Sequence, residues 1–91
     1  MIVVTVKVQV EHSRQQALVD RYNQVSHQEL SSKGCIDYRL YQDPGSNDQF
    51  FFYEAWENQQ SFDEHVARAP LESFVDCIVS ANIYHAEKIE A

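Results

Sequence analysis

Residues 4–11 alternate between hydrophobic and polar side chains. Valines occupy every second position of this segment, and they are Val4, Val6, Val8 and Val10. A period of two residues places alternate side chains on opposite faces of a β-strand, and β-branched side chains favour strands. The pattern therefore predicts a strand with one buried face within residues 1–10.

A helical pattern follows this strand. Ser13 and Gln16 have the spacing of a capping box, in which the two side chains bond free backbone N–H groups at the start of a helix. Helical spacing then aligns one set of side chains on a single side, namely Leu18, Tyr22, Val25 and Glu29. Gly34 can adopt the left-handed conformation that ends a helix. We predict a helix from Ser13 to about Lys33.

The middle of the chain predicts a β-hairpin. Residues 35–42 alternate again between apolar and polar side chains, and residues 43–48 read Asp-Pro-Gly-Ser-Asn-Asp, a dense set of turn formers. The aromatic run from Phe50 to Tyr53 lies within a second strand over residues 49–56. Because this strand is apolar on both sides, we expect it to lie inside the sheet with something packed on each face.

An interrupted helix and a last strand complete the pattern. Ser61 and Glu64 repeat the capping-box spacing, and Pro70 interrupts the helix that follows. Apolar residues at helical spacing precede the proline, and they are Phe62, Val66 and Ala69. Helical spacing resumes over residues 71–78, and residues 83–89 predict a weaker strand.

The resulting order β-α-β-β-α-β is that of the ferredoxin-like α+β fold with an antiparallel sheet, and we expect one such domain over residues 1–91. If the hairpin has no bulge, one face of its strands points to the helices and carries Ile36, Tyr38, Leu40, Phe51, Tyr53 and Ala55. The opposite face then carries Cys35, Asp37, Arg39, Tyr41, Phe50, Phe52, Glu54 and Trp56.

The second of these faces is too aromatic to remain in water. We therefore expect a second copy of the chain to cover it in a homodimer, with Arg39 and Glu54 forming an ion pair at the interface. One bulge in the hairpin would exchange the two faces, because side-chain direction alternates with every residue.

Composition and charge narrow the possible partners. The chain is 44% hydrophobic and has a formal net charge of −7, which repels nucleic acid and anionic membrane surfaces. No apolar run approaches the roughly 20 residues of a membrane-spanning helix, so we expect a cytoplasmic protein. Cys35 and Cys77 form no CxxC pair, and the histidines lack short metal-ligand spacings. We therefore expect reduced cysteines and no metal site.

The candidate chemistry centres on His65. This residue shares the apolar side of the second helix, so its imidazole should point towards the sheet, where it can act as a base near neutral pH. A core histidine bonded to a backbone carbonyl is the alternative. Tyr53, on the face expected to meet this helix, can offer a hydroxyl, although a buried tyrosine can also serve packing alone.

Two further polar side chains, Ser26 and Glu29, fall on or near the inward side of the first helix. They either line a cavity or reach solvent at the edge of the helix. The sequence contains no phosphate loop, glycine-rich dinucleotide motif or GxSxG motif, so we expect no cofactor.

Five segments together resemble the antibiotic biosynthesis monooxygenase (ABM) domain family. They are Gly34-Cys35, Tyr38-Arg39-Leu40-Tyr41, Gln42-Asp43-Pro44, Phe52-Tyr53-Glu54-Ala55-Trp56 and His65. The resemblance implies a ferredoxin-like homodimer whose sheets pack face to face as a dimeric α+β barrel, with a pocket between sheet and helices in each subunit. It also implies that His65 and Tyr53 face this pocket as the catalytic pair. We expect the pocket to be lined by Ser26, Glu29, Tyr38, Trp56, Phe62 and Phe74.

Characterised members of this family include cofactor-free monooxygenases that oxidise anthrones or quinols with O₂. The leading hypothesis is therefore a cofactor-independent monooxygenase that acts on a small aromatic or quinol-like substrate. The same segments also resemble the LsrG-type isomerase of phosphorylated autoinducer-2, but the chain departs from it at Trp56 and at Leu71, where a histidine is usual. A non-catalytic dimer that binds a small molecule is the third alternative. Haem degradation is disfavoured, because Val6 and Val75 stand where haem-degrading relatives need Asn and His.

Overall fold

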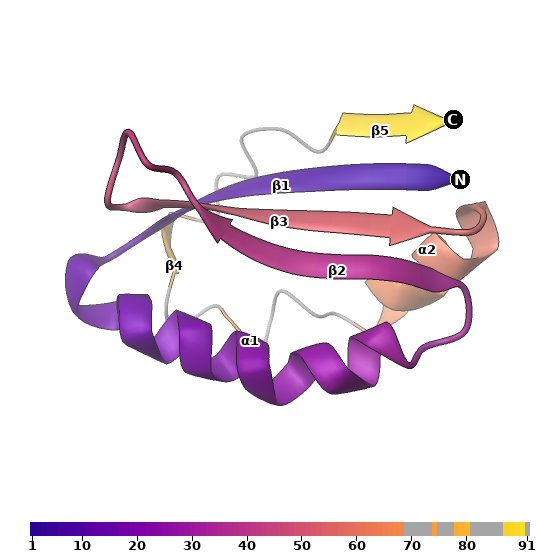
Figure 1. The fold of residues 1–91 in the computed structure, drawn as a ribbon, viewed down its shortest axis with the longest axis horizontal. Coiled ribbons are helices and arrows are strands. Elements are labelled where there is room, and N and C mark those ends of the chain that lie inside the picture. The colour runs from indigo at the N-terminus through magenta and orange to yellow at the C-terminus, as the bar shows by residue number, and fades with distance from the viewer. Residues whose placement is uncertain (69–73, 75–77, 81–86, 91) are drawn as a thin grey trace.

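The computed structural model describes residues 1–68, 74, 78–80 and 87–90 of the chain (Figure 1). The strands are β1 (Ile2–Val10), β2 (Cys35–Gln42), β3 (Gln49–Trp56), β4 (Ile78–Ser80) and β5 (Glu87–Glu90). The helices are the short 3₁₀ turn η1 (His12–Arg14), α1 (Gln15–Leu30) and α2 (Gln59–Ala67). None of the helices in these described segments is long and apolar enough to cross a membrane.

The strands form one antiparallel sheet around β1. Strand β3 pairs with β1 over its whole length, and β2 pairs with the outer side of β3. The other side of β1 pairs with β4 near Val10 and with β5 near Ile2. This arrangement confirms the predicted ferredoxin-like α+β fold and the inner position of β3.

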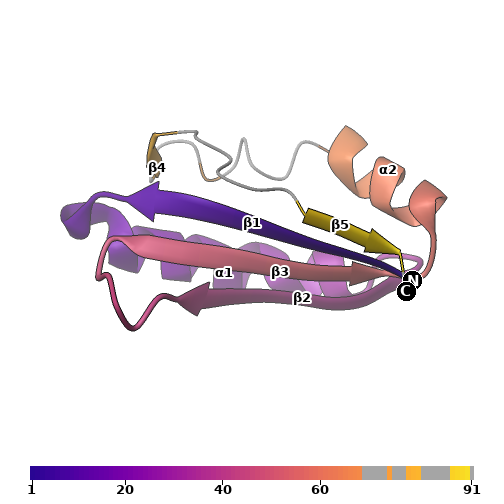
Figure 2. The same ribbon diagram turned by 90° about the horizontal axis from the view of Figure 1, so that it is seen from above.

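Both helices cover the same face of the sheet. In Figure 1, α1 lies below the strands and α2 lies at their right-hand end, and Figure 2, seen from above, shows α1 beneath the sheet. The alternating valines of β1 are buried on this face, as their pattern predicted. The core between sheet and helices is formed by Ile2, Val4, Val6, Val8, Val10, Leu18, Tyr38, Phe50, Phe52, Trp56 and Phe74.

The helix ends differ from the predicted capping boxes. The chain enters α1 through η1, and no side chain caps the first turn of either element, so the box at Ser13 is wrong. Helix α2 begins at Gln59, because Asn58 accepts a hydrogen bond from the Ser61 backbone N–H at 2.9 Å. Helix α1 ends at Leu30 with Ser31 as its C-cap, earlier than the predicted end near Lys33. Gly34 is left-handed as predicted, with a φ of 83°, but it lies beyond the end of the helix.

The faces of β3 are exchanged relative to the prediction. In β2, Tyr38 and Leu40 face the helices as expected, whereas Ile36, expected on the same face, is 51% exposed. Gln42 pairs with Phe50 next to the turn, so residues 43–49 lie between the paired positions. The predicted turn contained residues 43–48, one residue fewer. Tyr38 therefore lies opposite Glu54, and the helix-covered face of β3 carries Phe50, Phe52, Glu54 and Trp56. A register shift between Cys35 and Asp37 adds a bulge at the start of β2.

This exchange also overturns the predicted ion pair between Arg39 and Glu54. Arg39 Nε instead lies 2.7 Å from Asp37 Oδ1, while Glu54 is buried under the helices. The predicted helical segment over residues 71–78 lies mostly outside the described residues, but its last residue, Ile78, belongs to strand β4. Strand β5 begins at Glu87, and the earlier part of the predicted last strand, residues 83–86, also lies outside the described residues.

Candidate functional site

The inward orientation predicted for His65 is confirmed. The residue lies in the last turn of α2 and is only 2% exposed. Its ring packs against the Trp56 ring at 4.6 Å between centroids and meets the Tyr38 ring edge-on at 5.7 Å. The half-buried Phe62 ring, one turn earlier on α2, lies 6.3 Å away. An ionisable ring is thus enclosed by aromatic side chains from α2, β2 and β3.

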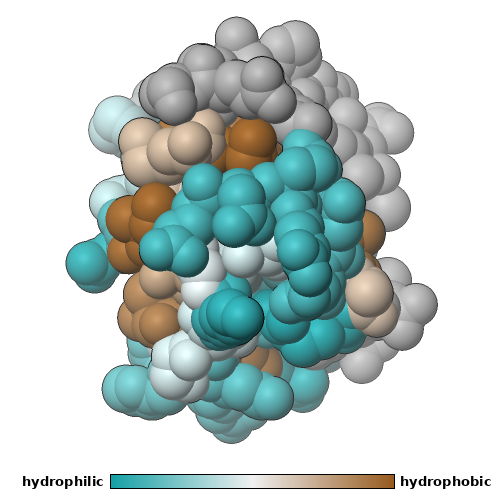
Figure 3. All heavy atoms as spheres, turned by 90° about the vertical axis from the view of Figure 1, so that its right-hand side faces the viewer, coloured by the Kyte–Doolittle hydropathy of each residue, from teal (hydrophilic) through white to brown (hydrophobic). Residues whose placement is uncertain are grey.

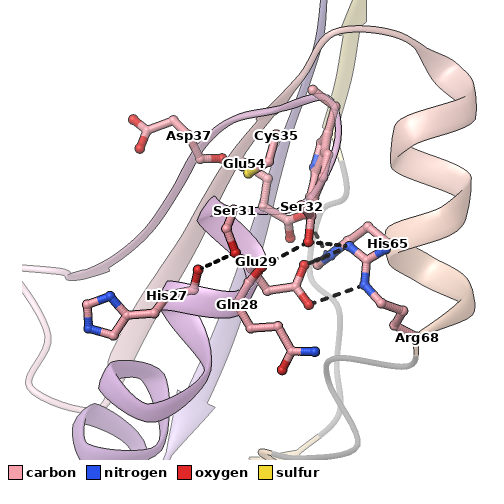
Figure 4. Close-up of polar contacts among 11 residues, drawn as sticks. His27, Gln28, Glu29, Ser31, Ser32, Cys35, Asp37, Glu54, His65 and Arg68 are labelled. Atoms are coloured by element: carbon pink, nitrogen blue, oxygen red, sulfur yellow. Dashed lines mark hydrogen bonds and ion pairs between the residues drawn. The ribbon is translucent and has the colours of Figure 1, made fainter.

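Two buried carboxylates hold the two ring nitrogens of His65 (Figure 4). Nδ1 lies 2.8 Å from Oε2 of Glu29, which comes from the last turn of α1. Nε2 lies 2.9 Å from Oε1 of Glu54, which comes from β3. The three side chains are between 3% and 9% exposed. The alternative of a core histidine bonded to a backbone carbonyl is therefore wrong, because both partners are acids.

Each carboxylate has a further partner. Arg68, the residue after α2, places Nη2 2.9 Å from Glu29 Oε2 and 3.2 Å from the Ser32 hydroxyl. The indole Nε1–H of Trp56 donates to Glu54 Oε1 at 3.1 Å. We call Glu29, Glu54, Trp56, His65 and Arg68 the His65 cluster.

The charges of the His65 cluster balance when the imidazole is protonated, because Arg68 and His65 then offset Glu29 and Glu54. Burial lowers the pKa of His65, but the hydrogen bonds and negative charges of Glu54 and Glu29 outweigh burial and raise this pKa above its ordinary value. Burial raises the pKa of Glu29, but hydrogen bonds from Arg68 and His65 prevail and lower it. Both directions favour the ionised, paired state of the cluster.

A tight contact between two loops fixes the distance between Glu29 and His65. The Gly34 carbonyl accepts the Glu57 backbone N–H at 2.8 Å, joining the loop after α1 to the chain that enters α2. A Cβ atom on Gly34 would lie 2.6 Å from the Ser61 Cβ and closer still to its hydroxyl oxygen. Only a glycine therefore lets these elements approach closely enough to bring the end of α1 to the imidazole.

The other residues expected to line a pocket are distributed around this cluster. Tyr38 is buried beside His65, and its ring also stacks on Tyr22 at 5.8 Å. Phe74 is also buried, and its ring centroid lies 5.1 Å from that of Phe52. Ser26 is buried within α1, where its hydroxyl donates to the Asn23 carbonyl at 3.4 Å. The structure thus brings Glu29, Tyr38, Trp56 and Phe62 to His65, whereas Ser26 bonds only its own helix among the described residues.

The prediction that Tyr53 faces the same pocket as His65 is wrong. Tyr53 pairs with Thr5 and Arg39, on the face of the sheet that points away from the helices, because the longer turn reverses the faces of β3. Sequence reasoning missed Arg68 and assigned Glu54 to an interface. The signal for Arg68 was its position three residues after His65, which puts the two side chains on one side of a helical turn.

The described residues of this site offer neither a group of metal ligands nor an ionised thiol. Within the described segments, no group of three or more His, Cys, Asp or Glu side chains is arranged to hold a metal ion. Cys35, at the start of β2, is a free, half-buried cysteine. Burial, followed by the charges of Glu29 and Glu54, raises its pKa to about 11, so the thiol stays protonated at neutral pH.

The end of the molecule that contains α2 is shown in Figure 3. Hydrophilic residues cover the middle of this surface, and hydrophobic residues appear towards its margins. Three members of the His65 cluster, Glu29, Glu54 and His65, are not part of this hydrophilic surface, because their side chains are almost fully buried.

The sequence is similar to that of known proteins. The sequence profile of the family described as "Antibiotic biosynthesis monooxygenase" matches residues 1–76. An uncharacterized protein of Synechocystis sp. is 27% identical over 75 residues, which cover 82% of this chain and 51% of that protein. The chain thus spans about half the length of this curated relative.

Solved structures share the fold over nearly the whole chain. A conserved protein from Methanosarcina mazei superposes with a TM-score of 0.81 at 23% identity, covering 97% of this chain and 87% of that one. A protein from Deinococcus radiodurans, assigned without an established activity to the antibiotic biosynthesis monooxygenases, superposes with a TM-score of 0.84 at 14% identity, covering 100% of this chain and 92% of that one. At these identities the likeness establishes the fold.

Proposed function

Because the chain belongs to the antibiotic biosynthesis monooxygenase family, we propose that it is a cofactor-independent monooxygenase that oxidises a small phenolic or quinol-like molecule with O₂. The observation that carries this proposal is the His65 cluster, in which ionisable groups are buried against aromatic rings. Such surroundings suit a substrate that is itself aromatic and has one acidic hydroxyl. Perturbed ionisable groups in a buried position are typical of catalytic sites.

The proposed reaction begins with removal of a proton from the substrate hydroxyl. The His65 cluster takes this proton, and the substrate becomes an electron-rich anion that O₂ can oxidise directly. One oxygen atom enters the substrate, and the other leaves as water with two hydrogens from the substrate. Exclusion of bulk water by Tyr38, Trp56 and Phe62 protects the anion and strengthens the electrostatic interactions around it.

Oxygen consumption tests this proposal. Purified protein, treated with a chelator, is mixed with a panel of hydroquinones, catechols and anthrones, and O₂ uptake is recorded for the wild type, His65→Ala and His27→Ala. His27 is an exposed histidine on α1 and serves as the matched control. We expect uptake by the wild type and by His27→Ala, and a loss of about 100-fold or more in His65→Ala, the usual contribution of a positioned proton-transfer group.

Three results would contradict the proposal. Unchanged uptake in His65→Ala would remove His65 from the mechanism. Conversion of a substrate without consumption of O₂ would instead favour an isomerase, and tight binding without conversion would favour the non-catalytic binding dimer.

We also propose that two copies of the chain pair through the sheet face that the helices leave uncovered. Support comes from the aromatic side chains of the hairpin on that face: Tyr41 is 56% exposed, and its pairing partner Phe51 is half-buried under the Lys7 ammonium, 5.5 Å from the ring centroid. Contiguous exposed apolar surface is typical of an interface. Sedimentation velocity should give twice the mass of one chain for the wild type and a smaller mass for Phe51→Glu; a monomeric wild type would contradict the dimer.

A further inference from the structure

We propose that Glu54 is the catalytic residue that accepts the substrate proton, at Oε2, and that His65 is a positioning residue that holds this carboxylate in place. The inference rests on the proposed function for the class of substrate, a phenol or quinol, and it assigns the proton transfer to a particular atom. The basis for this assignment is the set of hydrogen-bonding groups that surround the imidazole.

Neither ring nitrogen of His65 is available to a substrate. Each faces a carboxylate oxygen at hydrogen-bond distance, 2.8 Å for Glu29 and 2.9 Å for Glu54. Each contact requires one proton between nitrogen and oxygen, since two lone pairs would repel. The three side chains therefore share two protons, either as an imidazolium between two carboxylates or as a neutral imidazole beside one carboxylic acid. In both arrangements the lone pairs of the ring are already occupied.

Among the described residues of the cluster, the carboxylate oxygen without a hydrogen-bond partner belongs to Glu54. Both oxygens of Glu29 face Arg68, at 2.9 Å and 3.5 Å, and Oε2 also faces His65. Oε1 of Glu54 lies within reach of both His65 Nε2 and the Trp56 indole N–H. Oε2 of Glu54 has no hydrogen-bond partner among the residues that the structure describes. A carboxylate oxygen that is held rigidly but left unbonded is suited to accept a proton.

Tyr38 supplies a donor beside this acceptor. It lies directly opposite Glu54 in the β2–β3 pair, so both side chains project from the same face of the sheet. The residue is 1% exposed, and within the described segments its hydroxyl makes no hydrogen bond. Burial, and then the charges of Glu54 and Glu29, raise its pKa, so the hydroxyl remains a neutral donor. It can therefore stabilise the oxyanion that forms when the substrate hydroxyl loses its proton.

The proposed step conserves atoms and charge. The substrate O–H bond breaks, the proton bonds Glu54 Oε2, and the electron pair stays on the substrate oxygen. With the imidazole protonated, the cluster starts neutral and becomes positive as the substrate becomes negative. The new anion thus lies against a positive charge in water-excluded surroundings, where the attraction is stronger than in water.

The described groups that face His65 come from every element packed around it. They are Glu29 from α1, Cys35 and Tyr38 from β2, Glu54 from β3, and Arg68 after α2. The thiol of Cys35 and the hydroxyl of Tyr38 stay protonated at neutral pH, because burial and the nearby carboxylates raise the pKa of both groups. The charge state of the site near neutral pH is therefore set by the two acids, His65 and Arg68.

The test compares two matched variants, Glu54→Gln and Glu29→Gln. Each removes one carboxylate from His65, but only Glu54→Gln removes the unbonded oxygen. We expect O₂ uptake to fall about 100-fold or more in Glu54→Gln. Glu29→Gln should retain most of the turnover, with a pH profile displaced because His65 loses a negative neighbour. Asp63→Asn, an exposed acid on α2, is the control for loss of a charge.

The opposite result identifies His65 as the base. If His65 itself accepts the substrate proton, Glu54→Gln frees Nε2 and should retain or increase turnover, and the proposal is overturned. Equal losses in Glu54→Gln and Glu29→Gln also overturn it, because they would report only on the shared ion pairs.

A binding measurement tests the role of Glu54 independently of the proposed oxidation. 4-Nitrophenol is titrated into each variant in the absence of O₂. Its absorbance reports whether the bound molecule is ionised. The wild type and Asp63→Asn should bind it as the neutral phenol, and Glu54→Gln should bind it about tenfold more weakly or worse, the usual loss for a hydrogen bond to a charged group. Equal affinity in Glu54→Gln, or no binding to the wild type, overturns the assignment even if no oxidation is found. If binding behaves as expected but no phenol or quinol is oxidised, only the proposed reaction fails.

Discussion

Three ionisable side chains, Glu29, Glu54 and His65, are buried together in a small core, and the partly exposed Arg68 bonds Glu29 from the edge of this core. Desolvation of such charges offsets much of their mutual attraction, and well-packed hydrophobic residues of similar volume would often be as stable. Removing one member leaves an unpaired buried charge, which costs about 3 to 5 kcal/mol. A cluster that costs desolvation energy and adds little stability supports the proposal that these residues have a chemical role.

The pH dependence of folding follows from the same residues. The pKa of His65 is raised in the folded chain, so its contribution to stability is complete below the ordinary imidazole value of 6.5 and is lost as pH rises through the folded pKa. The pKa of Glu29 is lowered, so its contribution is complete above the ordinary carboxyl value of 4.5 and is lost as pH falls through the folded pKa. Together the two groups stabilise the fold most between these two values.

Urea unfolding from about pH 5 to about pH 9 measures this dependence. We expect the free energy of unfolding of the wild type to decline above the ordinary pKa of His65, and the decline to be smaller in His65→Gln. The exposed His27→Gln should keep the wild-type slope. Parallel pH profiles for the wild type and His65→Gln would show that His65 has the same pKa in the folded and unfolded chains.

Sequence alone located part of this cluster. Helical periodicity found the inward orientation of His65 and the inward side of Glu29, because both patterns depend only on local spacing. It could not find the carboxylate of Glu54, because the face of a strand residue depends on the register across the turn. One additional residue between the paired positions moved Glu54 from the predicted interface into the core.

At the scale of elements, the site depends on the junction between the end of α1 and the start of α2. Gly34 combines a φ of 83° with a contact on Ser61 that leaves no room for a side chain. Gly34→Ala should therefore lower the free energy of unfolding by about 2 kcal/mol or more, the sum of a strained backbone and a displaced α2. Activity should fall as well, because a displaced α2 moves His65 away from Glu54.

Gly45→Ala is the matched control in this measurement. Gly45 lies in the turn between β2 and β3, and a Cβ there would lie 3.3 Å from an Asp43 side-chain oxygen that belongs to a surface turn. We expect a change of about 0.5 kcal/mol or less, as for most surface substitutions. Equal effects of the two substitutions would show that the Gly34 contact does not hold the junction.

The elements themselves were largely predictable, because alternation in β1 and helical spacing in α1 are local signals. The ends of the helices were less so. Ser13 has the spacing of a cap, yet the chain there forms the 3₁₀ turn η1, and the cap of α2 is Asn58. Whether a polar side chain caps a helix depends on the path by which the chain enters it, which tertiary packing decides.

At the scale of the whole molecule, charge favours the proposed class of substrate over a phosphorylated one. The net charge of −7 repels anions before they reach the site, whereas a neutral phenol is unaffected. Arg68, the basic group of the His65 cluster, is already bonded to Glu29 and Ser32. The oxidation that we propose would rely on a buried acid, an imidazole and surrounding aromatic rings, with the electrons supplied by the substrate.

Isotopic labelling tests the central claim most directly. The wild-type protein, treated with a chelator, is given the best quinol substrate under ¹⁸O₂, and the product is examined by mass spectrometry. The account predicts that one labelled oxygen atom enters each product molecule and that His65→Ala and Glu54→Gln form little labelled product. Product whose new oxygen comes from water, or equal labelling in all three proteins, would contradict a monooxygenase that works through the His65 cluster.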